Sequence, residues 1–175
     1  MWKRLALAAL LFTGTGFTPK EKQPVTAKLV TEHTSIHPGG TTRVGVHFEI
    51  EDGWHMYGEK PGDAGLPTKV AWAGPPKTQF GPLQYPPAHE FVDPGDIHTF
   101  GYSGSAVLFS TMTVAQEEKD VILITAYVSW LACKDVCVPG KAELDLALPV
   151  SIGPQMPSTS AESFFKPQAQ PQAPH

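Results

Sequence analysis

The stretch Thr41-Thr-Arg-Val-Gly-Val-His-Phe-Glu-Ile50 alternates in character, and its even-numbered positions from Val44 to Ile50 are all apolar. A two-residue alternation of this length is typical of a β-strand that buries one face. The segment Lys141-Ala-Glu-Leu-Asp-Leu-Ala-Leu-Pro-Val150 repeats the pattern near the other end of the chain. Both segments are therefore predicted to be strands with one buried face.

Three further segments predict strands because they are rich in β-branched and apolar residues: 25–34, 106–115 and 121–131. Weaker strand signals lie at residues 68–72 and 78–85. Pro-Gly, Asp-Gly and Gly-Pro pairs separate the segments, and none keeps a helical period over about 11 residues. We therefore predict an all-β fold, an immunoglobulin-like antiparallel β-sandwich.

The middle of the chain has a different composition. Residues 53–104 are dense in Gly, Pro, His and aromatic residues. Long loops of this kind in a small domain are usually functional. We expect this region to cover a functional site.

The N-terminus carries the pattern of a secretory signal peptide. Lys3 and Arg4 precede an uncharged run rich in Leu and Ala, and the small residues Gly14-Thr-Gly16 follow. We predict a signal peptide over residues 1–16, with an uncleaved anchor as the alternative. The uncharged apolar run of residues 121–133 has 13 residues, fewer than the 20 or so that a membrane-spanning helix needs. The expected protein is periplasmic or otherwise exported, with no membrane span after signal removal.

The C-terminal region differs in composition from the rest. Residues 154–175 contain five Pro and four Gln with one Lys and one Glu. Such a segment buries too little apolar surface to offset the entropy of ordering it. We predict one folded domain over residues 25–152 and a disordered Pro/Gln-rich tail over residues 153–175. Phe164 and Phe165 are the exception in this tail, with two interpretations open: a small docking patch, or a pair with no role.

The charge balance bears on the class of partner. The chain has 13 Lys and Arg against 17 Asp and Glu, a formal net charge of −4 at pH 7. Nucleic-acid binding needs a basic face, so no nucleic-acid partner is expected.

Cys133 and Cys137 are the two cysteines of the chain, within Trp130-Leu-Ala-Cys-Lys-Asp-Val-Cys-Val-Pro-Gly140. A bridge between them closes a loop of about five residues, which the chain-entropy model values at about 2 kcal/mol. Such a bridge stabilises the fold only modestly, but it places a disulfide that can accept two electrons in a loop. Thiol–disulfide exchange is the leading hypothesis, with no cofactor, and a purely structural bridge is the alternative.

The cysteines are predicted to lie at the end of a hairpin, because a predicted strand leads into Cys133 and another follows Pro139-Gly140. No helix N-terminus lowers the pKa of either thiol, and Lys134 is opposed by Asp135. We expect ordinary thiol acidity, which suits receiving electrons rather than acting as an oxidant. We further expect Cys137 to be the attacked sulfur and Cys133 the more buried, resolving one.

Metal binding is a third possibility. The two cysteines could bind copper or zinc together with some of His33, His37, His47, His55, His89, His98, Met56 and Met112. His33 and His37 form the one close His pair, and a strand does not bring residues four apart together. A non-catalytic sandwich that binds copper or a protein partner stays open as an alternative function.

Five ordered motifs resemble the N-terminal domain of the DsbD/ScsB thiol–disulfide interchange family: Ser35-Ile-His-Pro-Gly39, Gly53-Trp-His-Met-Tyr57, Pro61-Gly-Asp-Ala-Gly-Leu-Pro67, Phe100-Gly-Tyr-Ser-Gly104 and Trp130–Gly140. The resemblance runs from about residue 25 to residue 150. It implies an immunoglobulin-like periplasmic domain whose cysteine pair carries electrons. It also implies that a loop aromatic caps the disulfide. Phe100 is the matching residue, with Tyr57 and His55 beside it.

The resemblance also implies partners. Members of the family take electrons from a thioredoxin-like domain, which a membrane domain supplies, and pass them to oxidised periplasmic proteins, including those of cytochrome c biogenesis. We therefore expect a thioredoxin-like redox protein or domain as the direct partner. A membrane electron-transfer protein of the DsbD type is expected as an indirect one.

Overall fold

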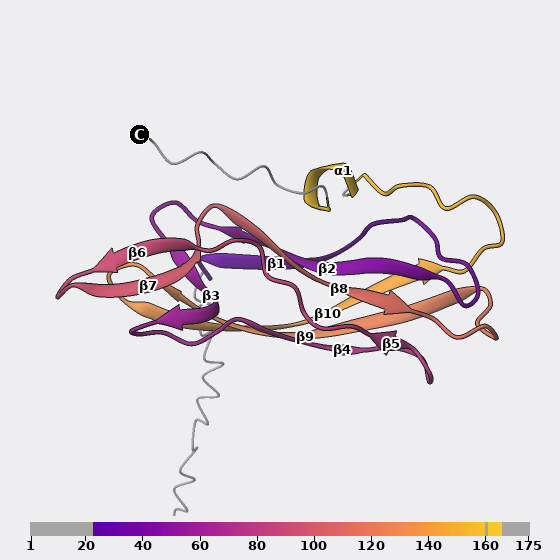
Figure 1. The fold of residues 1–175 in the computed structure, drawn as a ribbon, viewed down its shortest axis with the longest axis horizontal. Coiled ribbons are helices and arrows are strands. Elements are labelled where there is room, and N and C mark those ends of the chain that lie inside the picture. The colour runs from indigo at the N-terminus through magenta and orange to yellow at the C-terminus, as the bar shows by residue number, and fades with distance from the viewer. Residues whose placement is uncertain (1–22, 160, 166–175) are drawn as a thin grey trace, which may run out of the picture.

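The computed structural model describes residues 23–159 and 161–165, and within them the chain is a sandwich of two antiparallel sheets. The signal peptide predicted over residues 1–16 lies outside the described residues. Figure 1 shows the two sheets packed face to face as layers. The predicted all-β, immunoglobulin-like fold is confirmed.

One layer is a four-stranded sheet. Its strands, in spatial order, are β1 (Val25–Thr31), β2 (Thr41–Ile50), β8 (Ser105–Thr113) and β5 (Gln79–Phe80). The alternation that predicted β2 has its physical cause here, because Val44, Val46 and Phe48 face the other layer and are buried.

The second layer is a six-stranded sheet. Its main path runs through β10 (Cys137–Pro149), β9 (Val121–Cys133), β3 (His55–Gly62), β7 (Ile97–Tyr102) and β6 (His89–Asp93), and β4 (Lys69–Ala73) pairs with β9. The hairpin of β9 and β10 forms thirteen residue pairs, from Val121–Pro149 to Cys133–Cys137. This long ladder brings the two cysteines to its tip.

The core lies between the layers. Phe48 of β2 meets Trp130 of β9 edge to face, with ring centroids 5.7 Å apart. Trp130 also lies over Gly140 of β10, where an added Cβ would come within 2.1 Å of the indole ring. A glycine is required at this position because the backbone itself is the contact surface of the ring. Pro139 is accommodated beside it because β10 is an edge strand and no neighbour needs its amide.

The loops predicted over residues 53–104 are only partly loops, since the structure places the strands β3, β6 and β7 there. These strands escape pattern reasoning because they are short and lie among Pro and Gly residues. The pairing of β3 with β7 also shifts register between Tyr57 and Gly62, which breaks the alternation.

The tail predicted to be disordered from residue 153 instead contacts the sandwich as far as Phe165. The backbone amide of Ser158 donates to the carbonyl of Glu32 over 2.9 Å, and a four-residue helix, α1 (Ala161–Phe164), follows. Phe165 is only 4% exposed and packs on Val30 and Val107. Burial of this ring provides free energy that offsets the conformational entropy lost when the segment before it becomes ordered. Residues 166–175 lie outside the described part of the chain.

Among the helices of the described residues, none has the length and apolar character needed to cross a membrane.

Candidate functional site

Cys133 and Cys137 form a disulfide at the tip of the β9–β10 hairpin. They are paired across the ladder, with Cα atoms 4.1 Å apart and sulfurs 1.95 Å apart. The amide of Lys134 donates to the carbonyl of Val136 over 3.1 Å and closes the three-residue turn. Opposed residues of an antiparallel pair have Cα atoms about 4.5–5.5 Å apart, so the ladder itself brings the sulfurs into bonding range. The predicted hairpin-end position is confirmed.

The two cysteine residues differ in their exposure to solvent. Cys133 is 3% exposed, whereas Cys137 is an exposed residue. Cys133 lies on the outer face of the six-stranded sheet, because its neighbour Ala132 points into the core. The prediction that Cys133 is the more buried cysteine is confirmed. Cys137 is therefore the more accessible residue of the bridge.

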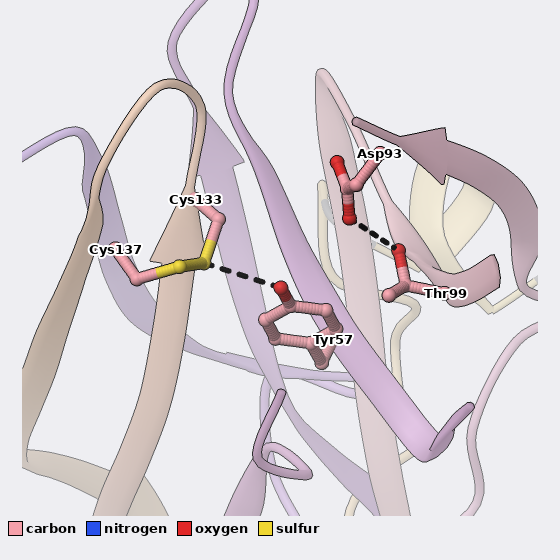
Figure 2. The surroundings of a disulfide bond; sticks show 5 residues. All are labelled: Tyr57, Asp93, Thr99, Cys133 and Cys137. Carbon is pink, nitrogen blue, oxygen red and sulfur yellow. Dashed lines mark hydrogen bonds between the residues drawn. A yellow bond between two sulfur atoms is a disulfide. The ribbon is translucent and has the colours of Figure 1, made fainter. Parts of the chain in front are cut away.

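Tyr57 of β3 covers Cys133. Its hydroxyl donates a hydrogen bond to the Sγ of Cys133 over 3.2 Å, as Figure 2 shows. The tyrosine is 2% exposed, and burial, assisted by the charge of Asp93, raises its pKa. The phenol therefore stays protonated and acts as a hydrogen-bond donor to the sulfur.

Two contacts hold Tyr57 in this position. The hydroxyl of Thr68 donates to the backbone carbonyl of Tyr57 over 2.7 Å. Gly65, with φ +97°, lies against the ring, and a Cβ there would come within 2.5 Å of it. The loop between β3 and β4 therefore closes over the tyrosine only because residue 65 has no side chain.

His55 is the second side chain beside the disulfide. It pairs directly with Cys133 in the β3–β9 ladder and is 7% exposed. Its ring meets Tyr57 edge to face at 5.3 Å and stacks on Phe91 at 4.6 Å. Burial lowers the pKa of His55, and the nearby charge of Asp93 opposes that shift only in part.

The β6–β7 hairpin closes the other side of the site. Asp93 accepts a hydrogen bond from the hydroxyl of Thr99 over 3.3 Å, and Figure 2 shows this pair beyond Tyr57. Thr99 is completely buried. Sequence reasoning missed Phe91, Asp93 and Thr99. The turn Pro94-Gly95-Asp96 was the available signal, since such a turn between short alternating segments is typical of a hairpin.

Phe100 does not take the position that the resemblance implies. Gly101 is the residue of β7 that pairs with Tyr57, so the side chain of Phe100 points to the opposite face of the strand. There Phe100, 38% exposed, lines a surface hollow with Lys60, Tyr85 and other residues. The structure thus brings Cys133, Cys137, Tyr57 and His55 together and places Phe100 elsewhere.

The geometry offers no ligand set for the metal-binding alternative within the described residues, which contain no suitably placed group of three or more His, Cys, Asp or Glu. The rings of His33 and His37 lie within hydrogen-bonding distance of other groups. Nδ1 of His33 lies 2.9 Å from the hydroxyl of Thr42, and Nε2 of His37 lies 2.7 Å from the carbonyl of Gly153.

The fold is similar to that of the N-terminal periplasmic domain of ScsB from Proteus mirabilis. The two share 18% sequence identity with a TM-score of 0.58, over 83% of this chain and 53% of that one. This chain thus spans about half the length of that structure. The DsbD N-terminal domain of Neisseria meningitidis in its reduced form is less similar, with 19% identity and a TM-score of 0.42 over 70% of this chain and 90% of that one.

A complex between the DsbD and PilB N-terminal domains of Neisseria meningitidis also matches, with 21% identity and a TM-score of 0.40 over 74% of this chain and 87% of that one. The comparison with curated proteins found no match. The family described as "Thiol:disulfide interchange protein DsbD, N-terminal" matches residues 22–149, which include every strand and both cysteines. With the disulfide at the tip of its longest hairpin, the chain belongs to the DsbD N-terminal domain family.

Proposed function

We propose that this chain is an exported thiol–disulfide exchange module that carries two electrons on Cys133 and Cys137. The observation that carries the proposal is the unequal burial of the bridge, with Cys137 exposed and Cys133 3% exposed under Tyr57. A purely structural bridge has no need of one exposed cysteine and one buried, hydrogen-bonded cysteine. Membership of the family supports the same conclusion.

The exchange uses the two sulfurs in different roles. A thiolate of the electron donor attacks the Sγ of Cys137, the bond to Cys133 breaks, and Cys133 leaves as a thiolate. The donor's second thiol then resolves the mixed disulfide and releases Cys137. Two electrons have moved to the cysteine pair, and delivery to an oxidised partner reverses the steps. The hydroxyl of Tyr57 faces the sulfur on which negative charge develops.

Tyr57 and His55 form the proposed shield of the site. Both are nearly buried and both lie beside Cys133, so a thiol from solvent has one route of attack, through Cys137. A partner that fits around the hairpin tip gains access to that sulfur. A small thiol can also reach Cys137, but it gains no binding energy from contacts with the hairpin tip.

The proposed direct partner is a thioredoxin-like redox protein or domain, because its paired cysteines supply both the attacking and the resolving thiol. A membrane protein of the DsbD type supplies it with electrons, and oxidised periplasmic proteins receive them. The signal pattern over residues 1–16 supports an exported, periplasmic site of action.

Trapping of the mixed disulfide tests the proposal. The full mature chain carrying Cys133→Ala is mixed under mild oxidation with a thioredoxin-like domain that lacks its own resolving cysteine. We expect a covalent complex through Cys137, and a much lower yield with Cys137→Ala, whose remaining sulfur is buried. The reduction potential is the second measurement. A value below about −300 mV, typical of structural bridges, together with no trapping by either variant, would contradict the proposal.

A further inference from the structure

His55 and Cys133 are neighbours across β3 and β9, on the outer face of the six-stranded sheet, and both are buried there. They are paired in the β3–β9 register, and residues directly opposite each other point to the same face, with Cβ atoms about 4.5–5.5 Å apart. The exposed fractions are 7% for His55 and 3% for Cys133. The imidazole and the sulfur of Cys133 are therefore close to each other in a part of the protein that contains little water.

Packing rather than hydrogen bonding holds the ring of His55. It lies between Phe91, on which it stacks at an interplanar angle of 15°, and Tyr57, which meets it edge to face. Its Nε2 is buried and has no hydrogen-bond partner among the described residues. An unpaired buried nitrogen costs stability, so its retention needs an explanation.

The reaction at Cys133 needs a group that can accept a proton. After reduction, Cys133 is a buried thiol, and it must lose its proton before it can attack the sulfur of Cys137. The titratable and charged groups around it are His55 and Tyr57 of β3, Asp93 of β6, and Lys134 and Asp135 of the hairpin turn.

Four of these groups are poorly suited to the task. Tyr57 is a protonated donor, because burial raises its pKa. The carboxylate of Asp93 accepts the hydroxyl of Thr99. Lys134 and Asp135 are exposed in the turn, on the side of the bridge that faces solvent. His55 remains, and its lowered pKa keeps the imidazole in the neutral form that accepts a proton at pH 7.

We propose that His55 takes up and returns the proton of the Cys133 thiol during exchange. The inference rests on the proposed function and assigns a proton path to it. In the delivery direction, the Cys137 thiolate attacks the partner disulfide, and one partner sulfur leaves as a thiolate. His55 then removes the proton of Cys133, the new thiolate attacks the Sγ of Cys137, and the bond between Cys137 and the partner breaks. The partner's second sulfur leaves as a thiolate with the second electron, and His55 returns its proton to solvent.

The test separates the two sulfur steps in time. The reduced full chain is mixed with a nitrobenzoate disulfide reagent, whose coloured thiolate is released once when Cys137 attacks and once when Cys133 resolves. Both phases are followed from about pH 5 to about pH 9, a range that includes the ordinary pKa values of imidazole and thiol. His55→Phe keeps an aromatic ring between Phe91 and Tyr57 and removes both nitrogens. His55→Gln keeps polarity without a base.

We expect both variants to slow the second phase near pH 7 by about a hundredfold, the lower end of general base catalysis, and to leave the first phase unchanged. The pH profile of the second phase should lose the inflection that belongs to the imidazole. His47→Phe is the matched control. His47 is 5% exposed and also has a buried nitrogen without a hydrogen-bond partner, but it lies in the four-stranded sheet, where Nδ1 is 3.7 Å from a carboxylate oxygen of Glu49. This control should leave both phases unchanged.

Each other outcome overturns the inference. A second phase that is equal in wild type and both His55 variants removes His55 from the proton path and leaves the exchange function standing. Slowing by His55→Phe alone shows a packing effect. A wild-type chain with no second phase contradicts the proposed function itself, and the proton path with it.

Discussion

The hydroxyl of Tyr57 lies 3.2 Å from the Sγ of Cys133 and donates its hydrogen to it. One strand thus supplies a polar contact to the sulfur of the buried Cys133, while Cys137 is an exposed residue. Charge develops on Cys133 when the bridge opens, and hydrogen bonds to charged groups contribute about 1.5–3 kcal/mol.

Tyr57→Phe should therefore slow reduction of the bridge by a thioredoxin-like donor by about tenfold, which corresponds to about 1.4 kcal/mol. The ring stays, so the fold should be unaffected. Stopped-flow kinetics measure the rate. Tyr102→Phe is the control, because its hydroxyl donates to the carbonyl of Pro86, on the core side of the same sheet. Equal rates for the two variants would show that the Tyr57 hydroxyl has no role in the reaction.

Reduction of the bridge should leave the fold intact. The short loop gives the disulfide only about 2 kcal/mol of stabilisation, and the β9–β10 ladder runs to the cysteines without depending on the bond. Far-UV circular dichroism with and without reductant measures the β signal. Loss of that signal on reduction would identify the bridge as a structural staple.

Tyr57→Ala should speed reduction by a small thiol such as dithiothreitol, because it removes the side chain that covers Cys133. Phe100→Ala should leave that rate unchanged, since the ring of Phe100 lines the hollow with Lys60 and Tyr85. Rates are measured under identical folding conditions for both variants. An effect of Phe100→Ala as large as that of Tyr57→Ala would restore Phe100 as the cap.

Gly65→Ala should destabilise the fold and expose the bridge at the same time. The substitution places a side chain at positive φ, which costs about 1–3 kcal/mol, and drives a Cβ into the Tyr57 ring. Gly95→Ala is a matched control, with φ +94° and no atom within 4 Å of its Cβ position. The denaturation midpoints of both variants should fall by similar amounts, because both place a side chain at positive φ. Only Gly65→Ala should speed reduction of the disulfide by dithiothreitol. Equal reduction rates would mean that Gly65 does not position the tyrosine.

Phe165→Ala should release the C-terminal segment from the four-stranded sheet. The buried ring contributes about 1.5–3 kcal/mol, and the guanidinium of Arg43 lies 5.1 Å from its centroid. Hydrogen exchange of the amides of Thr34 and Ser158, which bond across this contact, should accelerate. Ile152→Ala, at a residue that is 92% exposed, should leave the exchange rates of both amides unchanged. Unchanged exchange in Phe165→Ala would show that the backbone bonds alone hold the segment.

The five strands with clear patterning were predictable because each buries one face, and the hairpin-end bridge followed from two of them. The cap was not predictable in the same way. Phe100 and Gly101 are adjacent in sequence, but a strand turns them to opposite faces, so a one-residue difference in register decides which one faces Tyr57. Phe165 was noted as part of a docking patch, but the tail around it was still predicted to be disordered, because composition averages over a segment whereas a single buried ring decides whether the segment docks.

The segment after β10 returns across the outer face of the four-stranded sheet and ends, in the described chain, at Phe165 on Arg43, Val30 and Val107. The disulfide lies on the outer face of the other sheet. Phe165, the last described residue, is therefore attached to the sheet that lies away from the sulfurs. A redox partner that docks at the hairpin tip therefore approaches from the side opposite this segment.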